Sequence, residues 1–295
     1  MMTEKNLLLI DGFNLLSRAH FATSYNRTND QLKNSKGIYV NALRVFYQKI
    51  FNLIRDHKIT HLSVVWDVKR EETTRRQKYD FYKATRFELP EPLIHQYVTC
   101  REASEAIGIH QISLSPYEAD DLMGAISKKW VNGACFIYSN DRDLFQLLSE
   151  TTSQIIASKQ GEYIYSKKSF QLDYGINPEQ WVDVKALLGD SSDNIPGCPG
   201  IGEKSALPLI QHYGSLECIY ENIEQLEPSL CRHKKKLIQG KETTLISKEL
   251  SQIICDIEEL HQFQLDELML GIRTEILMEL LGQLELKIRI DQFGA

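Results

Sequence analysis

Short apolar runs, each followed by polar residues, recur in the first half of the chain. They cover residues 7–10, 62–66 and 135–139. Buried parallel strands have this continuous apolar pattern because both faces of their sheet are covered. Between the runs, apolar residues recur at helical spacing, as in the series Val40, Leu43, Phe46, Ile50, Leu53 and Ile54. Strand then helix, repeated, predicts an α/β fold with a mostly parallel central sheet flanked by helices.

Two further patterns indicate a helix start and a domain boundary. Ser115-Pro116-Tyr117-Glu118 has the form of a capping box with proline at the first helical position, which predicts a helix start there. From about Asn177 the strand pattern ends, and glycine, proline and charged helical patterns continue to the C-terminus. We therefore expect one domain over residues 1–176 and a mostly helical domain over residues 177–295.

The composition is that of an ordinary globular protein. The chain has 295 residues, of which 42% are hydrophobic, so it can bury a large core. Its six cysteines include no CxxC pair, which argues against a zinc site or a disulfide framework. No stretch approaches the roughly 20 apolar residues of a membrane span, and residues 1–5 lack the order of a signal peptide. We expect a cytoplasmic protein with no membrane partner.

Acidic residues stand where parallel strands end or helices begin. Such positions converge on one crevice at the carboxyl edge of the sheet. Each acid alone is readily explained as a helix cap. Together they would repel one another unless cations neutralised them, and oxygen ligands favour Mg²⁺ or Mn²⁺. The nine candidate metal ligands are Asp11, Asp67, Glu118, Asp120, Asp121, Asp141, Asp143, Asp190 and Asp193.

An all-carboxylate site of this kind indicates phosphodiester hydrolysis. Two metal ions about 4 Å apart can activate a water molecule and stabilise the leaving oxygen. The net charge of −6 argues against a polyanionic partner, because phosphate contacts supply much of the affinity for nucleic acids. Removing nine metal-neutralised acids from −6 leaves +3, which permits a basic surface that faces DNA.

A basic and aromatic segment follows Asp67. Residues 69–86 contain seven Lys or Arg and three acids, interleaved with three aromatic residues. Cations contact phosphates and aromatic rings stack on bases, so this is the pattern of a surface for single strands, although a solvated amphipathic helix would also produce it. On a helix, Lys83 and Arg86 would share one face and could hold a scissile phosphate.

A glycine-rich turn over residues 197–206 precedes another helical pattern. Its Gly200 and Gly202 allow backbone N–H groups to hold a phosphate, and Lys204 would lie in the first helical turn. The spacing is that of a helix-hairpin-helix, and the GxxxxGK[ST] sequence of a P-loop is absent. Such an element contacts duplex backbone without reading bases.

The motifs together resemble the 5′-3′ exonuclease and flap endonuclease family, including the nuclease domain of bacterial DNA polymerase I. The resemblance covers roughly residues 5 to 255. The matching segments are Asp11-Gly12, Val65-Trp66-Asp67, Tyr82-Lys83-Ala84-Thr85-Arg86, Glu118-Ala119-Asp120-Asp121, Ser139-Asn140-Asp141-Arg142-Asp143-Leu144, the run from Gly189 to Gly197, and Gly200-Ile201-Gly202-Glu203-Lys204.

This resemblance implies a PIN-like nuclease core with a helical arch at about residues 69–100 and a helix-three-turn-helix in the helical domain. It implies magnesium-dependent cutting of 5′ flaps and 5′ ends of DNA, by a monomer, with a potassium ion at the turn. RNA primer ends are a further expected substrate. Asp120, Asp141, Asp143, Asp190 and Asp193 would be the more direct metal ligands.

The resemblance also implies roles for basic and aromatic residues. Lys83 and Arg86 would contact the scissile phosphate and, with Asp120 and Asp141, carry the catalysis. Tyr82 would stack near the reacting nucleotide. The expected DNA contacts are Arg18, Tyr82, Lys83, Arg86, Gly200, Gly202 and Lys204.

Two departures from the family pattern stand out. Phe13 occupies a position that is usually small or polar, and residues 22–36 form a longer segment than is typical. Neither removes a carboxylate, so both metal sites are expected to work. The chain ends where a polymerase domain would begin, and we expect the nuclease to act unlinked.

Three other functions fit parts of the pattern. A PIN-type ribonuclease would share the strand-end acids, but such domains need about half this length. A haloacid-type phosphatase needs an aspartate where Phe13 stands. A non-catalytic protein that binds branched DNA would have no reason to keep nine mutually repelling acids.

Overall fold

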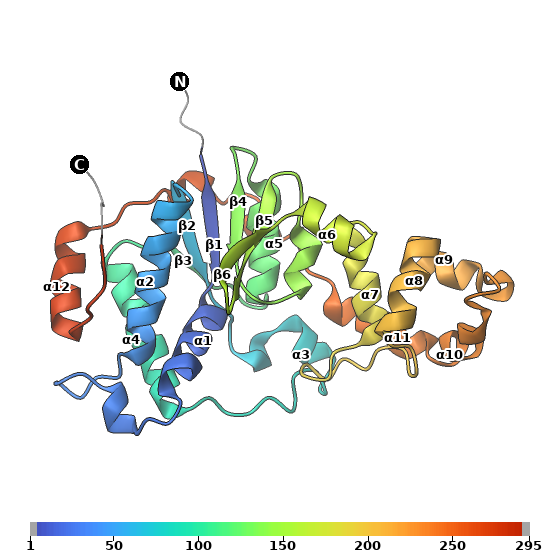
Figure 1. Ribbon diagram of the computed structural model, residues 1–295, viewed down its shortest axis with the longest axis horizontal. Helices are drawn as coiled ribbons and strands as arrows, with labels where there is room; N and C mark the ends of the chain where they lie inside the picture. The colour runs from blue at the N-terminus through green and yellow to red at the C-terminus, as the bar shows by residue number, and fades with distance from the viewer. Residues whose placement is uncertain (1–4, 291–295) are drawn as a thin grey trace.

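The computed structural model describes residues 5–290; residues 1–4 and 291–295 of the two expected domains lie outside this range. Within it, six strands form one sheet in the order β3-β2-β1-β4-β5-β6, with β1 to β5 parallel and β6 antiparallel (Figure 1). The strands are β1 (Leu7–Asp11), β2 (His61–Val65), β3 (Gln111–Ile112), β4 (Cys135–Tyr138), β5 (Thr152–Ser158) and β6 (Gly161–Tyr165).

Helices connect the parallel strands and then make up most of the second half. Those of the first half are α1 (Gly12–Ser24), α2 (Asn41–Asp56), α3 (Thr74–Lys78), α4 (Glu91–Ala106), α5 (Ala119–Lys129) and α6 (Lys167–Tyr174). Those of the second half are α7 (Trp181–Leu188), α8 (Glu203–Tyr213), α9 (Leu216–Glu221), α10 (Lys234–Gln239), α11 (Lys241–Ser251) and α12 (Thr274–Leu284). None of the helices in residues 5–290 is both long and apolar enough to cross a bilayer.

The two faces of the sheet bury alternate residues of the same strand. Leu8 and Ile10 of β1 pack in a core with α1, α2 and α4, whereas Leu7 and Leu9 pack with α5 on the other face. Side chains alternate between faces along a strand, and both faces are covered here, so β1 is apolar at each of these positions. This explains why the strand pattern is continuous rather than alternating.

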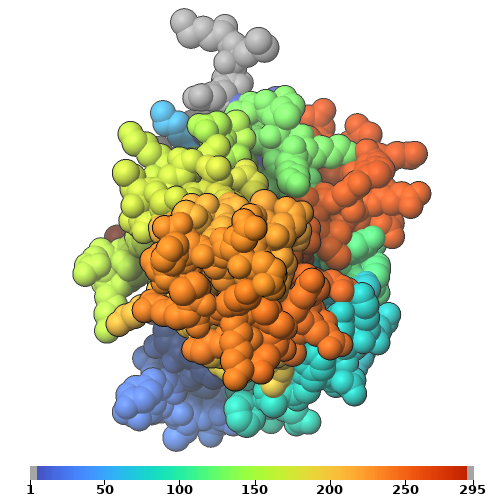
Figure 2. Space-filling view, turned by 90° about the vertical axis from the view of Figure 1, so that its right-hand side faces the viewer, coloured from blue at the N-terminus to red at the C-terminus, as the bar shows by residue number. Residues whose placement is uncertain are grey.

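A helical lobe lies beside the sheet and has its own core. Leu187 of α7 and Leu209 of α8 are fully buried in it. Figure 2, viewed from this side, shows the lobe in front of the sheet domain, with the cyan segment around residues 70–90 below it. The chain then returns: Ile257 and Leu268 pack against the α5 face, and Leu277 of α12 packs in the core with α2. The lobe therefore ends near residue 251 rather than at the C-terminus.

The expected α/β fold with a mostly parallel sheet is confirmed, as are the three strands and the helix at 40–54. Strands β3, β5 and β6 were not anticipated. β3 is two residues long, and β6 is a mostly exposed edge strand. Short or exposed strands lack the continuous apolar run that marks a buried one.

The helix start expected at Pro116 is wrong by three residues. The helix α5 begins at Ala119, and Glu118 is its N-cap residue. The Asp121 carboxylate accepts a hydrogen bond from the Glu118 backbone N–H, at 3.1 Å. The reciprocal acid of the cap is thus Asp121, three residues beyond Glu118, and residues 114–117 form a turn instead, closed by the hydrogen bond from the Tyr117 N–H to the Leu114 carbonyl.

The segment expected to form the arch, residues 69–100, divides into two parts. Glu91–Ala106 is α4, whose Leu93 and Cys100 are buried in the sheet core. Residues 69–90 cross the carboxyl edge of the sheet and contain one short α-helix, α3 (Figure 1). Lys83 has a positive φ of 53°, so the expectation that Lys83 and Arg86 share a helical face is wrong.

Candidate active site

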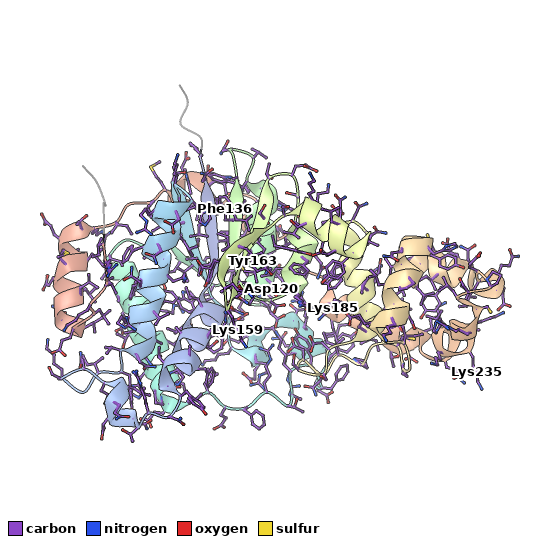
Figure 3. The ribbon with its side chains drawn as sticks, in the orientation of Figure 1. Asp120, Phe136, Lys159, Tyr163, Lys185 and Lys235 are labelled. Carbon is purple, nitrogen blue, oxygen red and sulfur yellow. The ribbon has the colours of Figure 1, made fainter. Side chains whose placement is uncertain are left out.

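Four acids gather at the carboxyl edge of the sheet. Asp11 ends β1, Asp67 follows β2 and Asp141 follows β4, while Asp120 lies in the first turn of α5. Parallel strands bring their carboxyl ends to one edge, which explains why three separate segments meet here. In Figure 3, Asp120 lies at this edge, between the sheet and the helical lobe.

These four acids, which we call the open acid group, repel one another. Burial raises the pKa of Asp11 to about 7, and the charges of Asp67 and Asp141 add to the shift. Burial, followed by the charges of Asp141, Asp11 and Asp67, raises the pKa of Asp120 well above its ordinary value. No ion pair joins any of the four to a Lys or Arg within residues 5–290. The group therefore favours a bound cation.

Hydrogen bonds from neighbouring segments hold two of these carboxylates in place. The Asp11 carboxylate caps α1 by accepting from the Asn14 backbone N–H at 3.0 Å, and it accepts from the Ser139 hydroxyl at 2.9 Å. The Asp67 carboxylate accepts from the Ala119 backbone N–H at 2.9 Å. Each contact ties the end of one strand to the next element, which fixes the open acid group without neutralising it.

Lysine and arginine side chains face this group from residues 69–90. The Lys83 ammonium lies 2.6 Å from a Glu118 oxygen and 3.9 Å from an Asp193 oxygen. Arg86 donates to Asp193 through Nε at 3.0 Å. The Lys83 backbone N–H also donates to the Asp193 carbonyl at 2.9 Å. The cationic segment is therefore bound to the turn that carries Asp193.

Tyr82 does not have the exposure that stacking on a nucleotide requires. Its side chain is 3% exposed and packs against Ile195 and Leu250, while its hydroxyl donates to Glu118 at 3.0 Å. The expected stacking role is therefore corrected: Tyr82 supports Glu118, which in turn pairs with Lys83.

Lys185 was missed by the sequence analysis. This α7 residue points toward the acids (Figure 3), and its ammonium lies 2.9 Å from Asp143 and 3.1 Å from Asp190. Burial and the nearby Asp141 charge raise the pKa of Asp143 to about 6, although Lys185 opposes the shift. Burial alone would raise the pKa of Asp190, but Ser192 and Lys185 outweigh it and lower that pKa. The only sequence signal was a lysine five residues before Asp190, which is too common to single out.

Asp121 is not placed to bind a metal. It is fully buried, and both of its oxygens accept from the Arg75 guanidinium, at 2.7 and 2.8 Å. The same oxygens also accept from the backbone N–H groups of Glu118 and Ile254. Four donors occupy the carboxylate, so the expectation of a metal ligand is corrected to a structural ion pair.

The remaining acids fit a divalent cation in part. In residues 5–290, no three Asp, Glu, His or Cys side chains surround a common point as metal ligands do. The carboxylates of the open acid group have no ion pair with a Lys or Arg in residues 5–290, and burial raises the pKa of Asp11 and of Asp120; such carboxylates suit Mg²⁺. The other three acids already form ion pairs with side chains of the protein. Lys185 pairs with Asp143 and Asp190, and Arg86 pairs with Asp193, so these acids do not belong to the open acid group.

The glycine-rich turn lies between α7 and α8. Gly189 and Gly197 both have positive φ, and a Cβ on Gly189 would lie 2.7 Å from the Gly197 nitrogen. The turn closes only because both residues lack a side chain. Beyond it, Gly202 is the N-cap of α8 and its Cβ position is open, while Lys204 is exposed in the first helical turn. Lys204 thus lies where a duplex backbone could approach.

Two further expected residues have defined contacts. Gly200 accepts a hydrogen bond at its carbonyl oxygen from the Lys236 ammonium, at 2.8 Å. Arg18, on α1, is exposed and donates to the Asn140 side chain, which follows β4. Arg18 therefore borders the same edge of the sheet as Asp141.

Comparison with known proteins decides the family. Residues 6–175 match the 5′-3′ exonuclease N-terminal resolvase-like domain, and residues 176–273 match the 5′-3′ exonuclease C-terminal SAM fold. The chain belongs to the 5′-3′ exonuclease family. It is similar to a 5′-3′ exonuclease of Halalkalibacterium halodurans, with 56% identity covering 96% of this chain and 95% of the relative.

Two further relatives are less similar to this chain. A 5′-3′ exonuclease of Bacillus subtilis is 36% identical, covering 87% of this chain and 86% of the relative. DNA polymerase I of the same organism is also 36% identical, covering 86% of this chain but only 28% of the polymerase. The second similarity therefore concerns one part of a much longer protein.

Solved structures share the fold. The zinc-bound T5 5′-exonuclease has a TM-score of 0.67 and 22% identity, covering 94% of this chain and 99% of the other. The catalytic core of Rad2 in complex with DNA substrate has a TM-score of 0.60 and 15% identity, covering 95% and 87%. Both confirm the architecture of the sheet domain and helical lobe.

Proposed function

We propose that this 5′-3′ exonuclease family member hydrolyses phosphodiester bonds at 5′ ends and 5′ flaps of DNA, using Mg²⁺ for which Mn²⁺ can substitute. The observation that carries the proposal is the open acid group facing the cations of residues 69–90. A group of acids by itself would be consistent with a structural metal ion, and a group of lysine and arginine side chains by itself would be consistent with DNA binding without cleavage. Here the acids and the cationic side chains face each other across the carboxyl edge of the sheet. This arrangement suits hydrolysis of a phosphodiester, which uses both bound metal ions and fixed positive charge.

The chain's own residues have distinct tasks in this proposal. Asp11, Asp67, Asp120 and Asp141 would hold the metal ions. Bound Mg²⁺ would supply an activated water and stabilise the leaving oxygen.

The cationic side would position the strand. Lys83 and Arg86 would exchange Glu118 and Asp193 for the scissile phosphate, because its two non-bridging oxygens share a negative charge and offer an anionic partner similar to a carboxylate. Lys185 would hold Asp143 and Asp190 beside the metal. Lys204 and the backbone of the turn at 197–202 would contact duplex phosphates, which carry no sequence information, so binding would follow DNA structure.

A flap-cutting assay tests the proposal. A 5′-labelled flap duplex and a matched single strand are incubated with the wild type and Asp141→Asn, in Mg²⁺ and in EDTA. We expect Mg²⁺-dependent cutting near the junction by the wild type and none by Asp141→Asn. Asp256→Asn, which changes an exposed acid paired with His261, is the matched control and should cut like the wild type.

Other outcomes identify the rival functions. Preference for RNA over branched DNA would indicate a PIN-type ribonuclease. Tight flap binding by the wild type without cutting, in Mg²⁺ or Mn²⁺, would indicate a non-catalytic protein that binds branched DNA. The RNA-primed version of the same flap tests whether primer ends are also substrates.

A potassium ion at the turn and a monomeric state are separate proposals. The Lys236 ammonium already contacts the Gly200 carbonyl, so potassium would bind the other carbonyls of residues 197–202. Duplex binding that weakens when NaCl replaces KCl at equal ionic strength would support the ion. Light scattering of the protein with and without a flap duplex tests the monomer.

A further inference from the structure

One turn of α11 connects the glycine-rich turn to residues 69–90. Ser247 is fully buried, and its hydroxyl accepts a hydrogen bond from the Gly197 backbone N–H at 2.8 Å. The next residue, Lys248, lies with its ammonium 2.6 Å from Asp183 of α7. These two contacts fix α11 against α7 and against the turn where we place the duplex (Figure 1).

The following residue, Glu249, contacts the cationic side. One of its carboxylate oxygens pairs with the Lys78 ammonium, and the other accepts from the Tyr79 hydroxyl at 2.8 Å. Lys78 ends α3 and Tyr79 is its C-cap residue, so both partners lie where the helix gives way to the loop that carries Lys83. The hydrogen bonds from Lys78 and Tyr79 hold the pKa of Glu249 below its ordinary value, so the carboxylate is charged at neutral pH.

A short series of contacts leads from Tyr79 to Lys83. The Tyr82 backbone N–H donates to the Tyr79 carbonyl at 3.0 Å, which closes a tight turn. The Tyr82 side chain is buried beside Leu250 of α11, and its hydroxyl donates to Glu118 at 3.0 Å. Lys83 follows directly, and its ammonium donates to the same Glu118 carboxylate. The place of Tyr79 on α11 therefore decides where the Lys83 ammonium lies.

Stability alone does not account for the contacts of Glu249. The Glu249 side chain is 49% exposed, and that of Lys78 is 55% exposed. Exposed ion pairs contribute little to folding, because water screens the charges. The contacts do provide a fixed position, since they bind the loop that carries Lys83 to the same helix that holds Gly197.

We propose that Glu249 is a positioning residue for cleavage. By holding Lys78 and Tyr79 on α11, it fixes Lys83 relative to the turn that contacts the duplex, and so sets how fast and at which phosphate the strand is cut. Glu249 acts through Lys83 and needs no contact of its own with DNA or metal. The proposal rests on the proposed nuclease function for the roles of Lys83 and of the turn.

Single-turnover cleavage of a 5′-labelled flap tests this role. We expect Glu249→Ala to lower the rate at saturating protein about tenfold, which is the scale of one hydrogen bond to a charged group, and to spread the cut from one main phosphate to its neighbours. Flap affinity in Ca²⁺ should stay that of the wild type, because the turn still contacts the duplex. Glu249→Gln, which keeps an acceptor for Tyr79, should recover most of the rate. Glu242→Ala, in the exposed first turn of α11, is the matched control and should cut like the wild type.

A double substitution shows whether Glu249 acts through Lys83. In a Lys83→Ala background, Glu249→Ala should lower the remaining rate no further, because the residue that it positions is gone. Urea denaturation should show equal stability for Glu249→Ala and Glu242→Ala, since the pair with Lys78 is exposed. Additive losses of rate in the double variant, or a wild-type rate and cut position in Glu249→Ala, would overturn the proposal.

Hydrogen exchange separates the positioning role from the nuclease function. In the protein without DNA, the Tyr82 and Lys83 amides donate to backbone carbonyls, so they should exchange slowly. In Glu249→Ala they should exchange faster, while the amides of α5 keep their wild-type rates. Unchanged exchange would overturn the positioning role even if the wild type cuts flaps normally. A wild type that cuts no substrate would overturn the nuclease function, while the exchange would still decide whether Glu249 holds this loop.

Discussion

Asp120 and Asp121 are adjacent in the sequence but differ in their charged neighbours and in their hydrogen-bond partners. Asp120 belongs to the open acid group and has a raised pKa because of burial and three neighbouring acids. Asp121 is fully buried, with four donors on its oxygens. A helix turns by about 100° per residue, so neighbours in its first turn face different surroundings. Residue type alone therefore cannot assign either role.

Isosteric substitution separates these two acids. Asp120→Asn should slow cleavage on the order of a hundredfold or more, because a proposed metal ligand is lost. It should leave the free energy of unfolding unchanged or higher, because a repelled charge is removed. Asp121→Asn should destabilise, by less than the roughly 3–5 kcal/mol of a fully unpaired buried charge, because the Arg75 guanidinium then keeps only Glu118 as a carboxylate partner. Urea denaturation and single-turnover cleavage measure the two effects. Equal stability of both variants would contradict the assignment.

Lys185 offers a second prediction for a single residue. Replacing Lys185 with Ala leaves Asp143 and Asp190 without their shared cation, so we expect a loss of about 2 kcal/mol in the free energy of unfolding without metal. Lys167→Ala, which removes an ion pair with the exposed Glu150, should cost less than about 1 kcal/mol. Denaturation in EDTA compares them, and a Lys185→Ala variant no less stable than Lys167→Ala would refute the neutralising role.

At the scale of elements, the junction of β1 and α1 places the first acid. Asp11 both ends the strand and caps the helix, so the helix must start immediately after it. Gly12 allows this because the Trp66 ring occupies the space beside it. The aromatic ring, the glycine and the acid therefore form one packing unit behind the open acid group.

Substitution of Gly12 tests that unit. A Cβ at this position would lie 2.6 Å from the Trp66 ring, so Gly12→Ala should destabilise by about 1–3 kcal/mol and displace Asp11, which lowers cleavage as well. Gly282→Ala is the control: its Cβ would meet nothing within 4 Å, and we expect a small stabilisation of α12. Thermal melts of the two variants should shift in opposite directions.

At the scale of the whole molecule, the C-terminal part closes the first core rather than extending the helical lobe. Leu277 of α12 is 2% exposed and packs in the core of α1, α2 and α4. The Asn34 side chain, near the other end of the chain, donates to the Leu284 carbonyl at 3.2 Å. The sheet domain is therefore complete only when both ends of the described chain are present.

Neighbouring substitutions on α12 test this closure. Leu277→Ala should cost about 2–5 kcal/mol, because it leaves a cavity in the core. Met278→Ala, at an exposed position of the same helix, should cost less than about 0.5 kcal/mol. If both variants melt alike, α12 does not contribute to the core in solution.

Metal binding should stabilise the whole fold. Mg²⁺ that binds only the native state raises the free energy of unfolding by mass action, so the Tm should rise with Mg²⁺ and return in EDTA. The rise should be much smaller in Asp120→Asn and unchanged in Asp256→Asn. A Tm that is independent of Mg²⁺ and Mn²⁺ in the wild type would contradict metal binding at the open acid group.

The sequence by itself determined the elements whose signals are local. The apolar runs ending in Asp11 and near Asp67 and Asp141 predicted buried parallel strands, and parallel strands with common carboxyl ends already bring such acids together. The glycines of the turn at 197–202 likewise identified a backbone conformation that few other residues adopt. These features depend on neighbours in the chain, so the chain order is enough to read them.

Only the tertiary structure decided which charge faces which. Arg75 pairs with Asp121, Lys185 with Asp143, and Arg86 with Asp193, across separations that no sequence spacing encodes. The burial of Tyr82 and the return of α12 to the first core are decided in the same way. Coulombic energy depends on distance and on exposure to solvent, and both are set by how distant elements pack.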